Sequence, residues 1–177
     1  MSALGGSTIV GMGKAIPSKV ITNHDLERLV NTTDEWIVTR TGIRERRVVP
    51  DGVTTSDIGF EAATEALRDA GVDAADLDLI IVGTATPDMI LPATACILQD
   101  RLGARHAGAF DVSAACTSWV YAAAMAHGYI AAGLAENVLV VGAETLSKIT
   151  NWRDRDTCVL FGDSAAAVIS RASRISR

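Results

Sequence analysis

The sequence predicts an α/β fold built around a mainly parallel sheet. Two short runs, Leu79–Val82 and Val138–Val141, contain only apolar residues, as expected for strands that are covered on both faces. Longer segments lie between such runs; they carry apolar residues at helical spacing or are rich in alanine, and several end at a glycine. Strands that alternate with helices of this length are joined by right-handed crossovers in a parallel sheet.

The other elements follow in chain order. A strand is expected from Thr8 to Met12, and Thr22 with Asp25 forms a capping pair for a helix that reaches about Val30. The remaining helices are predicted at residues 33–39, 54–70 and 92–102, ended by Gly42, Gly71 and Gly103. The remaining strands are predicted at 43–49, 107–113, 157–161 and 165–170, the last two joined by a turn at Gly162-Asp163.

The composition indicates one globular domain of ordinary size. The chain has 177 residues, 49% hydrophobic and 21% charged, which argues against a disordered chain. The net charge of −5 and a pI near 5.1 argue against general affinity for nucleic acids. The N-terminus shows no secretory signal, and the three cysteines lack metal-ligand spacing. We therefore expect a cytoplasmic protein with reduced thiols and no metal site.

Residues 112–135 contain no Asp, Glu, Lys or Arg. A helix at a protein surface shows one polar face, whereas a helix that is apolar all round is covered on every side. A membrane span would look similar, but alanine dominates this segment, and His127 and Gly128 interrupt it. We expect a central helix that ends near Gly133 and packs between two layers, without contact to a membrane.

Cys116 lies at the junction between the strand at 107–113 and this helix. The positive end of the helix dipole and unpaired backbone N–H groups favour the thiolate, which is the reactive form of cysteine. Cys116 is therefore a candidate nucleophile for acyl transfer. Cysteine is also one of the most frequently buried residues, so a small packed hydrophobe is the alternative.

Several segments keep the order and spacing of a known family from about residue 8 to residue 170. They are TDEWIVTRTGIRERR at 33–47, GFEAATEAL at 59–67, FDVSAAC at 110–116, VVGAE at 140–144 and FGD at 161–163. In these segments the chain resembles the β-ketoacyl-acyl-carrier-protein synthases III, the ketosynthases that start fatty-acid synthesis. The resemblance implies a homodimer and a thiolase-like fold, in which two similar halves form an α-β-α-β-α sandwich. This chain would be the N-terminal half, with a mainly parallel five-stranded sheet.

The resemblance also assigns roles to residues. Cys116 matches the acyl-accepting cysteine, which takes an acyl group from a coenzyme A thioester before malonyl-acyl carrier protein is decarboxylated and condensed. Leu91 matches a residue that reaches across the dimer into the partner's acyl pocket. Coenzyme A is a substrate rather than a permanent cofactor, and the positions that match its binding residues are Trp36, Arg40 and Arg155. Thr32 lies beside the matched segment and could also contact coenzyme A. Stacking and cation–π contact would let Trp36 and Arg155 clasp the adenine, while Arg40 could pair with a phosphate.

Each position also has an ordinary alternative. Trp36 could be a half-buried core residue, the arginines surface ion pairs, and Leu91 the apolar residue before a helix-starting proline. The basic run at 44–47 could receive an acidic carrier protein, or could be a solvated strand face, so it is not assigned to the site.

The resemblance implies a histidine and an asparagine from a second half, and none of the three histidines present lies in a matching motif. Such donors stabilise the enolate that decarboxylation produces. We therefore expect the chain to be incomplete for condensation and its central helix to expose an apolar patch. The alternative functions are a half-domain that acts by assembly and a thiolase-fold acyltransferase that forms no carbon–carbon bond. Residues 1–170 are expected to form the thiolase-like half, and the Ser/Arg-rich residues 171–177 a disordered tail.

Overall fold

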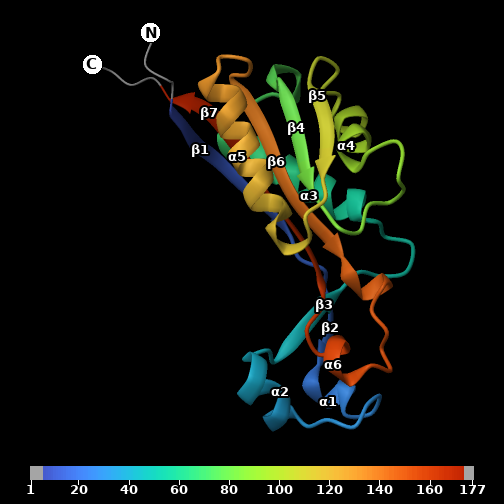
Figure 1. Ribbon diagram of the computed structural model, residues 1–177. Coiled ribbons are helices and arrows are strands. Elements are labelled where there is room, and N and C mark those ends of the chain that lie inside the picture. The colour runs from blue at the N-terminus through green and yellow to red at the C-terminus, as the bar shows by residue number, and fades with distance from the viewer. Residues whose placement is uncertain (1–5, 174–177) are drawn as a thin grey trace.

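The computed structural model describes residues 6–173, which form a five-stranded sheet with helices on both faces and a smaller lobe at one end (Figure 1). In spatial order the strands are β1 (Gly6–Ala15), β7 (Asp163–Ser173), β6 (Asn137–Thr145), β4 (Leu79–Gly83) and β5 (Gly108–Val112). Strands β4, β5 and β6 are parallel, whereas β7 runs antiparallel to both of its neighbours. The predicted α/β fold with a mainly parallel sheet is confirmed.

The helices cover the two faces of the sheet unequally. Helices α3 (Thr55–Ala70) and α4 (Thr94–Leu102) lie on one face, and α5 (Ser118–Ala131) lies on the other (Figure 1). Along β6, Leu139 and Val141 belong to the core under α3, whereas Val138 and Val140 belong to the core under α5. This alternation explains why the strand is apolar throughout. The capping box between Thr54 and Asp57 begins α3 as predicted.

One face of α5 packs on the sheet through Ala122, Ala126 and Ile130. The opposite face is exposed in the described chain, including the side chains Val120, Tyr121, Met125 and Tyr129. The expectation of a helix covered on both sides is therefore met on the sheet side only, while the expected apolar patch is present. No helix within residues 6–173 has both the length and the hydropathy needed to cross a bilayer.

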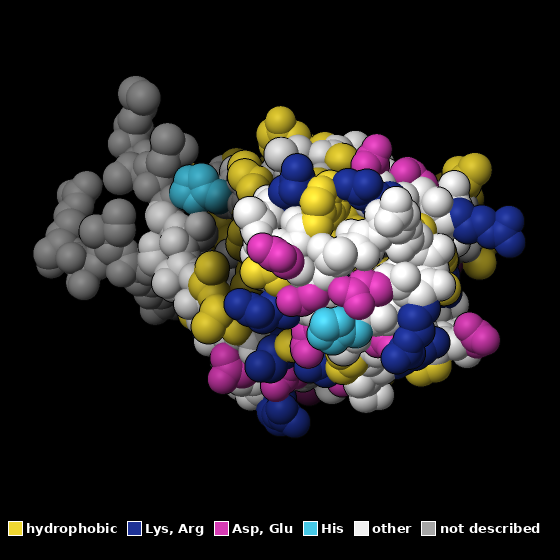
Figure 2. Space-filling model, turned by 90° about the horizontal axis from the view of Figure 1, so that it is seen from below, with side chains coloured by type: hydrophobic (Ala, Val, Ile, Leu, Met, Phe, Trp, Pro, Cys, Tyr) yellow, Lys and Arg dark blue, Asp and Glu magenta, His cyan; other side chains and the backbone are white. Residues whose placement is uncertain are grey.

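The smaller lobe, called the small lobe below, connects to the sheet through β1, β6 and β7. It contains β2 (Lys19–Thr22), α1 (Asn23–Leu26), α2 (Asp34–Thr41), β3 (Glu45–Val48) and α6 (Arg155–Cys158). Strands β2 and β3 pair antiparallel, and a separate core forms from Leu26, Ile37, Cys158 and Val159. Figure 2 views the molecule from the end that this lobe forms and shows basic and acidic side chains interspersed.

Three predictions in and next to this lobe are wrong. The helix that begins at the Thr22–Asp25 capping box ends at Leu26 rather than near Val30. Residues 157–161 do not form a strand. Asp154 caps a helical turn there by accepting hydrogen bonds from the backbone N–H of Asp156 and the hydroxyl of Thr157. The expected Gly162-Asp163 turn is also absent, because Asp163 begins β7. This strand continues to Ser173, past the expected domain end, and residues 174–177 lie outside the described part.

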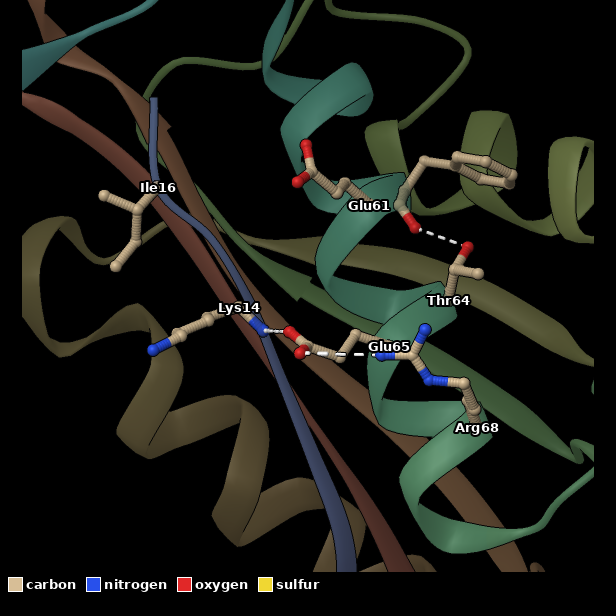
Figure 3. Close-up of a pocket in the computed structure, with 7 residues that line it drawn as sticks. Lys14, Ile16, Glu61, Thr64, Glu65 and Arg68 are labelled. Atoms are coloured by element: carbon tan, nitrogen blue, oxygen red, sulfur yellow. Dashed lines mark hydrogen bonds and ion pairs between the residues drawn. The ribbon is translucent and has the colours of Figure 1, made fainter. Parts of the chain in front are cut away.

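The exposed edge of β1 is closed by side chains of α3. The backbone N–H of Met12 donates to Asp69 at 2.8 Å, and that of Lys14 donates to Glu65 at 2.7 Å (Figure 3). Because the edge donors are satisfied, the strand offers less of a template for pairing with another chain. A groove between β1 and α3 runs past these residues. Glu65 accepts there from the backbone N–H of Lys14 and forms an ion pair with Arg68, so we assign the groove no ligand.

Glycine makes this close contact between β1 and α3 possible. A Cβ on Gly13 would lie 2.2 Å from the Ala62 carbonyl oxygen and 2.4 Å from the Ala66 nitrogen, both backbone atoms that cannot move aside. We expect Gly13→Ala to lower the free energy of unfolding by about 1–3 kcal/mol, the usual cost of overpacking. Gly128→Ala, where a Cβ meets nothing within 4 Å, should instead raise it by about 0.5–1 kcal/mol. Urea unfolding of both variants measures the difference, and equal stabilities would contradict this account.

Candidate functional site

Three segments with predicted site residues follow the carboxyl ends of the parallel strands β4, β5 and β6. Gly83 of β4 pairs with Val112 of β5, and the N–H of Thr84 donates to the Val112 carbonyl at 3.2 Å. The turn with Cys116 follows β5, the loop with Leu91 follows β4, and α6 with Arg155 follows β6 after one 3₁₀ turn. Binding sites of parallel sheets commonly lie at these ends.

Cys116 is exposed, so the alternative of a packed hydrophobe is wrong. It lies in a 3₁₀ turn, Ala115–Thr117, that leads directly into α5 at Ser118. The preceding Ala115 has a positive φ of 48°, which is uncommon and costly for a residue with a Cβ. The Ser118 hydroxyl holds this conformation by accepting from the N–H of Ala114 at 2.7 Å and donating to the carbonyl of Ala115 at 2.8 Å.

Two glycines place the start of α5 directly over the sheet. A Cβ on Gly83 would lie 2.9 Å from backbone atoms of Ser118 and Trp119, and one on Gly142 would lie 3.0 Å from the Trp119 ring. The first turn of α5, and the cysteine before it, can approach the strands only because both side chains are missing. Neither glycine was predicted to belong to the site, although a glycine within an otherwise apolar strand often marks a close approach.

Trp36, Arg40 and Arg155 form a stacked cluster in the small lobe, called the Trp36 stack below. The guanidinium carbon of Arg155 lies 4.1 Å from the centroid of the Trp36 ring, and that of Arg40 lies 4.4 Å from it. Trp36 and Arg40 belong to α2, so only Arg155 reaches the ring from another element. These three predicted site residues are thus brought together from distant parts of the sequence.

Two of the predicted coenzyme A-binding residues have a buried polar atom without a partner among the described residues. The Thr32 hydroxyl and Arg155 Nε are both buried without a hydrogen-bond partner among residues 6–173. Such atoms are rare in folded proteins and suit donors or acceptors that a ligand completes. The donors, the aromatic face and the positive charge fit the phosphates and base of a nucleotide. A planar base can enter between Arg155 and Trp36 only if Arg155 moves away from the ring.

The predicted basic run at 44–47 does not form one surface. Arg46 is buried, whereas Arg47 donates to Glu45 at 2.9 Å on the exposed side of β3. Arg46 is therefore neither on a solvated strand face nor available to dock a carrier protein, so both interpretations are wrong for this residue. The alternating exposure along a short strand could have indicated this, because neighbouring side chains point to opposite faces.

Leu91 lies in an exposed apolar tip, apart from the Trp36 stack. Ile90 is 91% exposed and Leu91 80%, so Ile90 projects at least as far as the predicted residue. Carboxylates hold the loop on both sides of this tip. Glu144 accepts from the N–H of Ala85 and the hydroxyl of Thr86, each at 2.7 Å, and Asp111 accepts from the first N–H groups of α4. Sequence reasoning missed both carboxylates, although each belongs to a segment that carried the family resemblance.

The other cysteines are packed. Cys96 is half-buried against the Ala109 carbonyl, and Cys158 is fully buried, which raises the pKa of its thiol. Within residues 6–173, no group of three His, Cys, Asp or Glu side chains is arranged to hold a metal ion.

Comparisons with known proteins show one group of enzymes to which the chain is similar. The family model described as 3-oxoacyl-[acyl-carrier-protein (ACP)] synthase III matches residues 110–176. A β-ketoacyl-[acyl-carrier-protein] synthase III from Xylella fastidiosa is 58% identical over 164 residues, which are 93% of this chain and 51% of that protein. The crystal structure of the synthase III from Aquifex aeolicus VF5 is 50% identical over 96% of this chain and 55% of that one, with a TM-score of 0.93. Over nearly all of its length, the chain is therefore similar to about half of a β-ketoacyl-acyl-carrier-protein synthase III.

The family likeness also fixes the fold as thiolase-like. A priming β-ketosynthase of the R1128 polyketide pathway, 35% identical, superimposes with a TM-score of 0.94 over 98% of this chain and 52% of that one. The chain thus spans about half the length of the curated relatives it matches.

Proposed function

We propose that this chain is the nucleophile-bearing part of an initiating ketosynthase. Cys116 attacks the carbonyl carbon of an acyl-coenzyme A, the thioester bond to coenzyme A breaks, and coenzyme A leaves as its thiol. The acyl group then passes to the carbanion that forms when malonyl-acyl carrier protein loses CO₂, which yields 3-oxoacyl-acyl carrier protein. The exposed position of Cys116 in a strained turn at the edge of the sheet carries this proposal.

The turn provides electrostatic support for the first step. A backbone N–H in the first turn of a helix lacks an intrahelical acceptor, so that of Cys116 can donate to the oxyanion of the tetrahedral intermediate. The Trp36 stack, with Thr32, would hold the nucleotide end of coenzyme A by stacking, cation–π contact and pairing with phosphate. Coenzyme A would be a substrate throughout, and no permanent cofactor is proposed.

The second step needs groups that we do not assign to this chain. His24 and His106 are exposed and His127 is hydrogen-bonded to Ser7, so none is offered as a donor to the enolate. We propose that the histidine and asparagine come from a further half of the protein, which would cover the exposed face of α5. Acylation of Cys116 and condensation would then be separable, and the present chain would perform only the first.

The tip of the β4–α4 loop supports a homodimer. Three consecutive apolar residues of this loop are exposed: Met89, Ile90 and Leu91. Carboxylates hold the loop in place on both sides of them. We propose that Leu91 enters the acyl pocket of a second subunit, where its volume would limit chain length.

A cytoplasmic location would fit the expected reduced state of the three cysteines.

The first step is tested by incubating the 177-residue chain with acetyl-coenzyme A and measuring its intact mass. The proposal expects one acetyl group per chain. A thiolase-fold acyltransferase would also be acylated but would pass the group to an acceptor without loss of CO₂. A half-domain that acts only by assembly would stay folded and gain no mass, which would contradict the proposal.

The exposed face of α5 should make the chain associate. Its side chains Tyr121 and Met125 would be removed from water by a second copy, at about 25 cal/mol per Å² of apolar area. We expect the chain to elute from a size-exclusion column as a dimer or larger species, and the double variant Tyr121→Lys and Met125→Lys to elute at a smaller size. Leu29→Lys, an exposed apolar residue of the small lobe, is the control and should elute like the unmodified chain. A stable monomer at high concentration would contradict this expectation.

A further inference from the structure

Arg46 is a buried cation whose hydrogen-bond partners are neutral. The residue is 4% exposed on β3, and no ion pair of its guanidinium is found among residues 6–173. Its Nε and Nη2 both donate to the carbonyl of Val159, at 3.1 and 2.6 Å, and its Nη1 donates to the side-chain oxygen of Asn23 at 2.7 Å. Burial lowers the pKa of Arg46, and burying a charge without an opposite one is costly.

The two acceptors lead to the two elements of the Trp36 stack. Val159 is the C-cap residue of α6, the helical turn that carries Arg155. Asn23 donates from Nδ2 to Asp34 at 2.8 Å, and Asp34 is the first residue of α2, which carries Trp36 and Arg40. One guanidinium therefore connects both sides of the stack through direct and relayed hydrogen bonds.

The position of Arg155 depends on α6 more than on its own contacts. Its Nε has no hydrogen-bond partner among the described residues, and its guanidinium rests on the Trp36 ring. The separation of Arg155 from Trp36 is then set by where α6 sits relative to α2. Arg46 fixes the carbonyl at the end of α6, so it controls that separation.

We propose that Arg46 is a positioning residue: by holding the end of α6, it sets where Arg155 stands over the Trp36 ring. The position of Arg155 in turn determines how readily its side chain moves aside for the planar base of a coenzyme A thioester. This inference rests on the proposed function. Arginine suits the role because its planar group presents several donors in a fixed fork, here two to one carbonyl and one to an amide oxygen. Lysine would keep the charge and lose the fork.

The test compares Arg46→Lys with Arg47→Lys, its neighbour on the same strand, whose side chain is on the surface. The rate of Cys116 acylation is measured by intact mass with two donors: acetyl-coenzyme A, and the acetyl thioester of N-acetylcysteamine, which has no nucleotide. We expect Arg46→Lys to slow acylation by subsaturating acetyl-coenzyme A at least tenfold. The acylation rate with the short thioester should stay within twofold of that of the unmodified chain. At saturating acetyl-coenzyme A, the acylation rate of Arg46→Lys should recover. Arg47→Lys should change neither rate.

If Arg46→Lys slows acylation equally with both donors, Arg46 has a general structural role and the inference is overturned. An unchanged acylation rate with acetyl-coenzyme A in Arg46→Lys would overturn it as well. If the unmodified chain is acylated by neither donor, the proposed function fails instead. The positioning role is then judged without any thioester, by amide hydrogen exchange of residues 154–160. Exchange there should be at least tenfold faster in Arg46→Lys and unchanged in Arg47→Lys, with α3 protected equally in both. Unchanged exchange in Arg46→Lys would overturn it.

Discussion

Replacing Cys116 with alanine is expected to abolish the acyl adduct completely. The thiolate is the only group that the proposal uses to form a covalent bond, and an alanine at this exposed position removes no packing contact from a core. The variant should therefore unfold at the same urea concentration as the unmodified chain. Intact-mass measurement after incubation with acetyl-coenzyme A should show the unmodified chain gaining one acetyl group and Cys116→Ala gaining none.

Cys96→Ala is the matched control for this experiment. Cys96 is half-buried and lies on α4, away from the turn that leads into α5, so its removal should leave the adduct unchanged. Loss of the adduct in Cys96→Ala, or its survival in Cys116→Ala, would show that acylation occurs elsewhere. The nucleophile assignment would then be wrong whatever the fold of the chain.

The part of the fold that sequence could predict is the part set by local chemistry. Buried parallel strands such as Leu79–Gly83 are apolar at every position, and the capping box at Thr54 and Asp57 specifies where α3 begins. Both predictions are confirmed, since neither signal depends on distant residues. The strand expected at 157–161 failed because its apolar residues pack in the small lobe, where Asp154 and Arg46 hold a helical turn.

The candidate site shows the same division. Cys116 could be found from its place between a strand and a helix, and the Trp36 stack from the family resemblance. The tertiary structure was needed to show that Arg46 bonds to the end of α6 and that Ala115 has a positive φ. The hydrogen bond from Arg46 joins β3 to the end of α6, more than a hundred residues away, so no local pattern encodes it.

Asp163→Ala is expected to destabilise the chain more than any surface substitution. Its buried carboxylate accepts hydrogen bonds from the N–H of Val49 and the N–H of Ser147, each at 2.8 Å, and from the Ser147 hydroxyl. These donors come from the segment after β3 and from the 3₁₀ turn after β6, while Asp163 begins β7. The Asp163 carboxylate thus links the small lobe to the sheet. The sequence had predicted only a turn at this residue.

The expected size follows from the donors that the substitution would leave buried. Each unsatisfied donor costs about 1–3 kcal/mol, so the two backbone N–H groups alone imply a loss of about 2–6 kcal/mol. A domain of this size has a total stability of about 5–15 kcal/mol, so the urea midpoint should fall markedly. Asp51→Ala, an exposed carboxylate in the turn after β3, should change stability by less than about 0.5 kcal/mol. Equal unfolding midpoints for the two variants would contradict this account of Asp163.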